Sequence, residues 1–299
     1  MANNIQLAQS YVDAFQESLF LGEKTGDLVN ADKFDFAGAK TVNVLKVDVD
    51  ELKQYNRQTG YGNSAIVNAT YQSMTMEAEV YNKYGVDHFD SEETKMQAYA
   101  GVLAEVAIKG KKTQDFYRLS KIAGASGITV ANAITISNGA TAVAELDKAE
   151  AQIVEDESER SDCNLYATPK FLQLLKRELG DKSGRFTLGT DDYNNQITYF
   201  DEMKVVEMPQ SRMYVGVQLN ATTQVWEAKV TNNTTQKVNF MIVNRTAVVC
   251  PLKVDLIKII DYLDNPNGNE DIIVPYIYFD AFVLDKRAKG IYVCPAVAS

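Results

Sequence analysis

The sequence predicts an α+β fold, in which strand-like and helical segments alternate along 299 residues. Three observations carry this prediction. Apolar and polar residues alternate between Met74 and Val80 with the period of two that a half-buried strand requires. Apolar residues recur at three- and four-residue steps between Met96 and Ile122, as on one face of a long helix. Beyond residue 130, strand-like and helical runs follow one another without an internal repeat, which favours α+β or α/β packing there.

The first expected element is an amphipathic helix over residues 4–21, which ends near Gly22. Its apolar positions share one face and are Ile5, Val12, Phe15 and Leu19. Because this helix has no core of its own, we expect it to form an arm. Residues 23–40 read as a loop.

A two-stranded ribbon is expected next, with Thr41–Val49 as its first strand. The apolar face of the second strand consists of Met74, Met76, Ala78 and Val80. Between the strands, residues 50–68 form a polar connection far longer than the usual hairpin turn, so we expect a functional or disordered tip. An isolated two-stranded ribbon is poorly stable. We therefore expect its apolar face to need a surface that this chain does not supply.

A long helix is expected to begin at Asp90 and Glu93, which have capping-box spacing, and to reach about Ala123. About thirty residues at 1.5 Å each give a length of about 45 Å. Gly101 and Gly110 each weaken such a helix by about 1 kcal/mol, so they are expected to be possible hinge positions. Three lysines flank Gly110: Lys109, Lys111 and Lys112. We interpret them as a solvated face; the alternatives are a contact with a neighbouring subunit or with nucleic acid.

The second half of the chain is predicted to contain short helices among strands. The expected helices cover 140–157 and 170–179, the second opened by Pro169, and the expected strands cover 165–168, 203–208, 215–230 and 238–249. A second projecting hairpin follows, because two strand-like runs, 252–262 and 274–284, flank a turn-rich tip. A last strand is expected at 291–294.

Composition excludes several classes of function. A net charge of −10 argues against sequence-independent nucleic-acid binding, which needs a clustered surplus of cations. No apolar run approaches the roughly 18 to 20 residues that span a bilayer, and residues 1–20 do not read as an export signal, so we expect no membrane partner and a cytoplasmic site of synthesis.

Residues for catalysis are scarce. Cys163, Cys250 and Cys294 are interpreted as buried thiols, because they are too few and too scattered for a disulfide framework or a zinc site. His88 is the only histidine and is interpreted as a solvated residue before a helix. No glycine-rich phosphate loop or GxSxG motif is present. We therefore expect no cofactor, no metal and no enzymatic activity.

Short sequence blocks occur in a characteristic order along residues 34–295. They are Tyr55-Asn56-Arg57 with Thr59-Gly60-Tyr61; Asp87 and Asp90 before Glu93-Thr94; Asp115 to Lys121; Met208 to Met213; and Phe279 to Lys286 with Gly290-Ile291-Tyr292. In this order the chain resembles the major capsid proteins of tailed bacteriophages, whose shell fold is typified by the Hong Kong lambdoid phage.

The resemblance implies a division of the chain into named parts. They are an N-terminal arm (1–33), an extended β-hairpin loop (34–86), the spine helix of a peripheral domain (87–129), an axial domain (130–248), the β-hairpin of the peripheral domain (249–288), and a C-terminal strand and tail (289–299). Some relatives carry a long helical extension before the arm. This sequence shows none, so a separate scaffolding protein, or prior trimming of this chain, is implied.

The resemblance also implies a structural role and a set of partners. Copies of the chain would form pentamers and hexamers of an icosahedral shell around phage double-stranded DNA, assembled in the bacterial host cytoplasm as a procapsid that matures into the virion capsid. A portal and decoration proteins are further implied partners, and the DNA would be contacted weakly and without sequence specificity. Expected intersubunit contacts are Tyr55, Arg57, Tyr61, Met74, Met76, Val80, Asn265 and Asn267. A lysine–asparagine cross-link, as in some relatives, would join Lys46 or Lys53 to Asn265 or Asn267, but lysine and asparagine are common in these segments.

Two alternatives differ from a phage shell. An encapsulin, which is a cellular compartment with the same fold, would enclose protein cargo instead of DNA. A cytoplasmic enzyme could use the long loop as a lid, and it would be monomeric in gel filtration.

Overall fold

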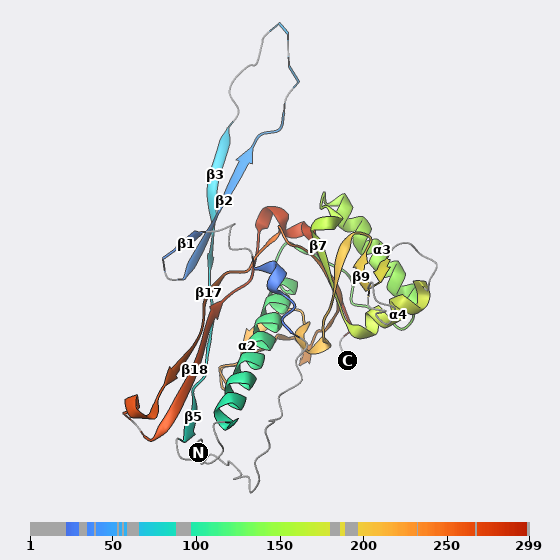
Figure 1. The fold of residues 1–299 in the computed structure, drawn as a ribbon. Coiled ribbons are helices and arrows are strands. Elements are labelled where there is room, and N and C mark those ends of the chain that lie inside the picture. The colour runs from blue at the N-terminus through green and yellow to red at the C-terminus, as the bar shows by residue number, and fades with distance from the viewer. Residues whose placement is uncertain are drawn as a thin grey trace. The chain divides into compact units, whose positions relative to one another are not determined.

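The computed structural model of the protein describes most of the chain beyond its first residues. The described residues are 22–29, 35–38, 40–52, 54–55, 57–58, 66–87, 97–179, 186–188, 197–231, 233–266 and 268–297. The chain divides into two compact units, one formed by residues 31–77 and the other by the rest (Figure 1). The helix expected at 4–21, His88, and the capping residues Asp90 and Glu93 lie outside the described residues.

The smaller unit is a three-stranded antiparallel ribbon in the order β1 (Asp35–Ala37), β2 (Thr41–Val49) and β3 (Val67–Thr75). β2 pairs with β3 along its whole length, from Thr41 opposite Thr75 to Val49 opposite Val67. The predicted partner strand is therefore confirmed. The predicted second strand is corrected, because β3 ends at Thr75 and a separate strand begins at Ala78.

In the larger unit, a long hairpin forms a sheet of its own. β17 (Leu252–Ile260) pairs antiparallel with β18 (Glu270–Phe279), which confirms the second predicted hairpin. The other edge of β18 pairs with β4 (Ala78–Tyr81) and β5 (Tyr84–Asp87). The expectation that this chain offers no surface to residues 78–80 is thus wrong. Ala78 is fully buried in a cluster with Tyr117 and Phe279, and Val80 packs against that cluster.

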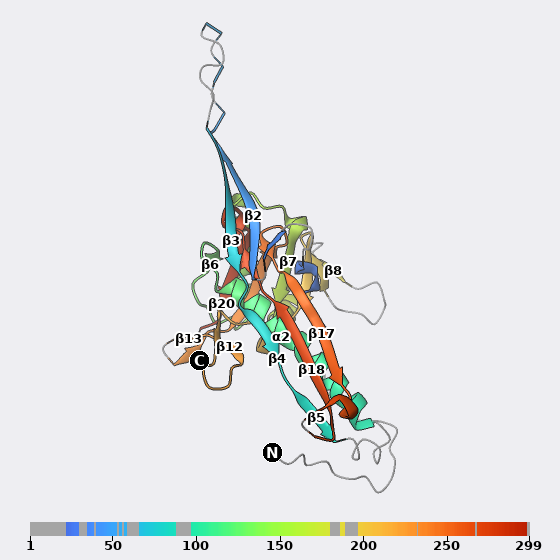
Figure 2. The same ribbon diagram turned by 90° about the vertical axis from the view of Figure 1, so that its left-hand side faces the viewer.

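Helix α2 (Gln97–Ala123) is the predicted long helix, and it runs beside the hairpin of β17 and β18 (Figures 1 and 2). Gly101 and Gly110 both lie inside it without ending it. Gly110 has a packing reason: a Cβ atom there would lie 3.0 Å from Cδ1 of Ile277 on β18. Glycine therefore lets the helix approach the sheet closely.

The core of the larger unit is a mixed seven-stranded sheet in the order β6-β20-β15-β7-β10-β9-β8. Its strands are β6 (Thr129–Val130), β20 (Ile291–Pro295), β15 (Val238–Asn244), β7 (Cys163–Ala167), β10 (Met203–Glu207), β9 (Ile197–Phe200) and β8 (Phe186–Leu188). β10 is parallel to β7 and β20 is parallel to β6, and the other pairs are antiparallel. The chain's last strand, β20, therefore completes a sheet that mostly comes from residues 129–244.

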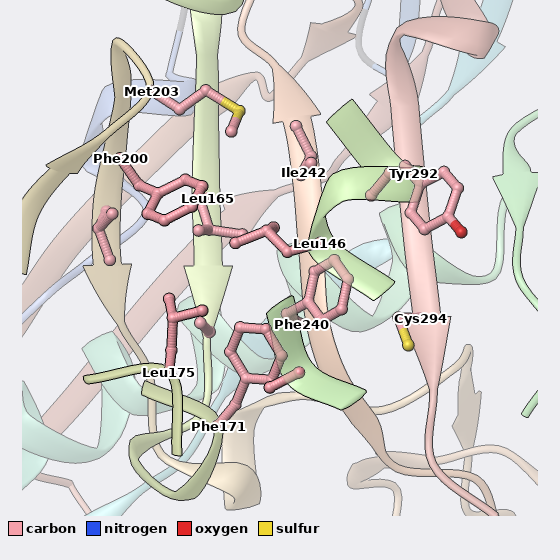
Figure 3. Packing of buried hydrophobic residues seen from close by; sticks show 14 of the residues in the cluster. Leu146, Leu165, Phe171, Leu175, Phe200, Met203, Phe240, Ile242, Tyr292 and Cys294 are labelled. Atoms are coloured by element: carbon pink, nitrogen blue, oxygen red, sulfur yellow. The ribbon is translucent and has the colours of Figure 1, made fainter. Parts of the chain in front are cut away.

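Both faces of this sheet are covered, as its continuous apolar strands require. On one face, α3 (Gly139–Glu155) and α4 (Pro169–Leu179) pack Leu146 and Phe171 against Leu165 and Phe240 (Figure 3). On the other face, neighbouring strand residues such as Tyr166 and Met241 pack against the end of α2. Successive side chains of a strand point alternately into these two cores, and this alternation fixes the register of the strand.

The remaining described elements are short. They are the 3-10 turns η1 (Gly26–Leu28), η3 (Arg160–Asp162), η5 (Gln210–Arg212), η6 (Tyr262–Asp264) and η7 (Asp285–Gly290), and the strand pairs β11 (Val217–Leu219) with β12 (Trp226–Ala228), β13 (Val230–Thr231) with β14 (Thr234–Thr235), and β16 (Val248–Val249) with β19 (Phe282–Val283). The region predicted as strands 215–230 is thus broken into small hairpins.

The close approach at Gly110 generates a prediction. Alanine is favoured over glycine in a helix by about 1 kcal/mol, but its methyl group would press on Ile277. We expect Gly110→Ala to give little gain in the free energy of unfolding. In an Ile277→Val background, which lacks Cδ1, the same change should stabilise the protein by about 1 kcal/mol. Urea unfolding of the wild type, the two single variants and the double variant measures this, and equal effects in both backgrounds would contradict it.

Candidate assembly surface and buried polar network

The ribbon carries an exposed apolar face along the half that lies next to the connection between β2 and β3. Because Leu45 pairs with Tyr71, Val47 with Ala69 and Val49 with Val67, these six side chains share one side of the ribbon. We call them the apolar ribbon face. Five of them are 47–68% exposed: Leu45, Val47, Val49, Val67 and Tyr71. Contiguous exposed apolar side chains of this kind mark interaction surfaces.

The face that the sequence pattern singled out is the opposite one. Met74 pairs with Val42, and both are buried, as is Met76, whose backbone N–H donates to the carbonyl of Lys40 at 2.8 Å. These side chains already lie out of water in the single chain. The intersubunit roles expected for Met74, Met76 and Val80 stay predictions, but little of the two methionine side chains is open to a neighbour.

The expected contact residues at the two tips have mixed outcomes. Tyr55 and Arg57 are exposed, while Tyr61 and Asn267 lie outside the described residues. The side-chain amide of Asn265 donates to the carbonyl of Glu270 at 2.9 Å and so closes the turn between β17 and β18. A local structural role therefore accounts for Asn265. The contacts of all five residues with another subunit stay predictions.

A buried carboxylate, that of Asp115 on α2, collects donors from two distant segments. It accepts hydrogen bonds from the backbone N–H groups of Lys24 and Thr25 at 3.1 Å and from the Thr25 hydroxyl at 2.6 Å. The guanidinium of Arg212 pairs with it at 2.8 Å and also donates to the carbonyl of Gly22. Asp115 and Thr25 are completely buried. A buried charge needs such partners, because it has lost water.

A second buried charge extends this network to the surface. Arg118, one turn beyond Asp115 and fully buried, donates to the Thr25 hydroxyl and pairs with Glu23, both at 3.0 Å. Glu23 also pairs with Lys111 at 3.1 Å, and Lys111 in turn lies 3.4 Å from Asp255 on β17. The interpretation of Lys111 as a purely solvated residue is therefore wrong.

A third buried polar group lies directly after Phe279, the last residue of β18. The buried carboxylate of Asp280 accepts from Lys121 at 2.7 Å and from the Tyr117 hydroxyl at 3.2 Å. The Tyr117 ring packs edge-on against Trp226, the single tryptophan of the chain. Three of the blocks that carried the resemblance thus meet at α2: Asp115 to Lys121, Met208 to Met213, and Phe279 to Lys286.

Asp115, Arg118 and Arg212 were not predicted as functional residues from the sequence. Asp115 and Arg118 are three residues apart, and Ile122 follows Arg118 by four residues, so these three side chains share one face of the helix. Because Ile122 is buried, that face lies in the core, and charges on it require partners. This spacing could have revealed a buried pair. Arg212 has no such local signal.

The ion pairs shift the pKa values of the two outermost groups. Burial raises the pKa of Glu23, but hydrogen bonds and charge attraction from Lys111 and Arg118 outweigh it, so the pKa lies below the ordinary 4.5. Burial lowers the pKa of Lys111, but the hydrogen bond and attraction of Glu23 outweigh it, so the pKa lies above 10.5. Both groups are therefore charged at neutral pH.

The described residues were also compared with the requirements of a reactive thiol, a metal site and a membrane span. Cys163, Cys250 and Cys294 are free and buried, which confirms the prediction of structural thiols. Burial raises the pKa of Cys163 and Cys250 to about 12. Within the described ranges, no group of three or more His, Cys, Asp or Glu side chains is placed to hold a metal ion. No helix in the part of the chain described here is long and apolar enough to cross a membrane.

A spine helix between a hairpin sheet and a mixed central sheet, together with a separate β-ribbon, defines a viral shell fold, and comparison with solved structures agrees. No protein-family model and no curated protein matches the chain. The capsid structure of cyanophage P-SCSP1u matches with a TM-score of 0.68 and 12% identity, covering 100% of this chain and 97% of that chain.

Two further structures match over similar lengths. The mature capsid of bacteriophage PhiM1 has a TM-score of 0.65 and 13% identity, covering 98% of this chain and 92% of that chain. A structure from Mycobacterium phage Che8 has a TM-score of 0.60 and 14% identity, with 98% of each chain covered. At such identities the likeness shows the fold. The chain has the major capsid fold of tailed bacteriophages, which confirms the predicted fold class.

The pKa of Glu23 generates a prediction about acid. Because the folded-state pKa is lowered, the contribution of this group is complete above about pH 4.5 and is lost as the pH falls through the folded-state value. Between about pH 5 and pH 3, unassembled wild-type protein should lose up to about 1 kcal/mol more stability than Glu23→Gln. Urea unfolding across this range tests it, with Glu51→Gln at an exposed position as the control. Identical pH slopes for wild type and Glu23→Gln would contradict the assignment.

Proposed function

We propose that this protein is the major capsid protein of a tailed bacteriophage, and that its copies assemble into pentamers and hexamers of an icosahedral shell around double-stranded DNA. The observation that carries the proposal is the capsid fold over the whole chain, together with an exposed apolar ribbon face that a single copy leaves in water. Such a face is costly for a lone soluble chain and useful to one that is covered by another copy.

The apolar ribbon face supplies the main contact between copies in this proposal. Each copy offers the same face, so each contact can be modest while a closed ring or shell makes the later contacts effectively intramolecular. Tyr55 and Arg57 near the tip add polar contacts. Assembly is then cooperative, and loss of the apolar contact from every copy at once is far more damaging than loss of a single contact.

The acidic composition suits a container for DNA. With a net charge of −10, the wall repels phosphates on average, so DNA can enter and leave without adhering to it.

A separate scaffolding protein, a portal and decoration proteins complete the proposed partners. The shell assembles in the bacterial cytoplasm as a procapsid, and maturation bends α2 near Gly101 and Gly110.

Electron microscopy tests the assembly directly. The protein, expressed alone or with its scaffold, should give closed particles, and particles recovered from infected cells should carry DNA by their absorbance ratio. Particles of this kind filled with a protein cargo instead of DNA would favour an encapsulin. A monomer in gel filtration under every condition, with no particles, would reject a shell protein and support the lid-loop enzyme.

A matched pair of substitutions tests the ribbon contact. Tyr71 lies on the apolar ribbon face and Thr70 on the opposite face, and both are exposed in the single chain. Tyr71→Asp should lower particle yield at least about tenfold, because an unpaired carboxylate in an apolar contact costs several kcal/mol. Thr70→Asp should assemble nearly as the wild type does. Both variants should keep the wild-type unfolding transition, and normal particle yield from Tyr71→Asp would refute the contact.

A further inference from the structure

Three segments that are far apart in the sequence meet at the ammonium group of Lys111. Glu23 belongs to the segment that joins residues before 22 to the core, Lys111 lies in the middle of α2, and Asp255 lies on the hairpin strand β17. Both carboxylates lie within 3.4 Å of the same Lys111 nitrogen. One cation thus serves two anions that come from different parts of the fold.

Each of the two outer segments is also anchored without Lys111. Residues 22–28 are held by Asp115, Arg118 and Arg212, and Leu28 is completely buried in the core beside α2. β17 is held by its antiparallel ladder with β18. Loss of the Lys111 contacts would therefore leave both segments folded. What would change is the link between them.

The link is weak enough to open. The side chains of Lys111, Glu23 and Asp255 are 35%, 26% and 36% exposed, so water and salt screen their attraction. Without the Lys111 charge, two carboxylates would face each other across a short distance and repel. The fully buried pair of Asp115 with Arg212 has no such exposure to solvent.

We infer that Lys111 couples the segment Gly22–Val29 to the hairpin of β17 and β18, so that displacement of one loosens the other. The coupling acts within one chain and does not rest on the proposed shell function. Its direction follows from charge: the cation holds the two segments together, and its removal turns the attraction into repulsion. Salt should weaken the link in the wild type by screening the attraction.

Hydrogen exchange on the unassembled full-length chain tests the coupling. Lys111→Met keeps the alkyl stem and removes the charge. Backbone amides of residues 22–29 and of β17 should both exchange about two- to fivefold faster than in the wild type. Lys112→Met, the neighbouring lysine on α2, serves as the control and should change neither segment. About 1 M salt should speed exchange in the wild type, because it screens the attraction, and should slow exchange in Lys111→Met, because it screens the repulsion between Glu23 and Asp255.

A rescue variant separates coupling from local damage. Adding Glu23→Gln to Lys111→Met removes the charge that repels Asp255, so protection of β17 should recover although Glu23 is not on that strand. A purely local role for Lys111 predicts no recovery. The inference is overturned if Lys111→Met changes only one segment, or if β17 exchanges equally fast in the single and double variants.

Discussion

The larger unit depends on how α2 accommodates charge on a buried face. The helix packs against the hairpin sheet along one part and against the central sheet along another, and Asp115 and Arg118 lie fully buried between. Their partners come from residues 22–25 and from Arg212, so the network fixes two distant segments on one helix. Breaking a buried pair by removing one partner costs about 3–5 kcal/mol. That is a large share of the roughly 5–15 kcal/mol that stabilises a typical domain.

The ribbon has the opposite character. The charges buried on α2 find partners, Asp115 with Arg212 and Arg118 with Glu23, whereas the side chains of the apolar ribbon face are exposed. The ladder of β2 and β3 satisfies the backbone but not these side chains. In the proposed function, this exposed face supplies the contact between copies.

Local patterns in the sequence predicted the elements but not the partnerships. Helical spacing predicted α2 and α3, Pro169 marked the start of α4, and strand-like apolar runs bounded by turn residues predicted β7, β10 and the hairpin of β17 and β18. The face of the ribbon was missed for a physical reason. In β2 the apolar positions change from even to odd between Val44 and Leu45, so no single alternation marks the exposed side.

Tertiary pairing escaped prediction for a different reason. Asp115 and Arg212 are 97 residues apart, and nothing near either one indicates the other. The split of the predicted second ribbon strand into β3 and β4 also depends on pairing, since β4 leaves the ribbon to join β18. The short sequence blocks that carry the resemblance supplied part of the missing information on tertiary pairing, because three of those blocks meet at α2.

We propose that a second copy covers the apolar ribbon face, and thiol labelling of Val47→Cys measures this directly. The three native cysteines are buried, so the introduced thiol is selective. Cys at position 47 should react readily in unassembled subunits and be protected in assembled particles, while Thr70→Cys on the opposite face stays reactive in both. Equal labelling of position 47 in subunits and in particles would contradict the account.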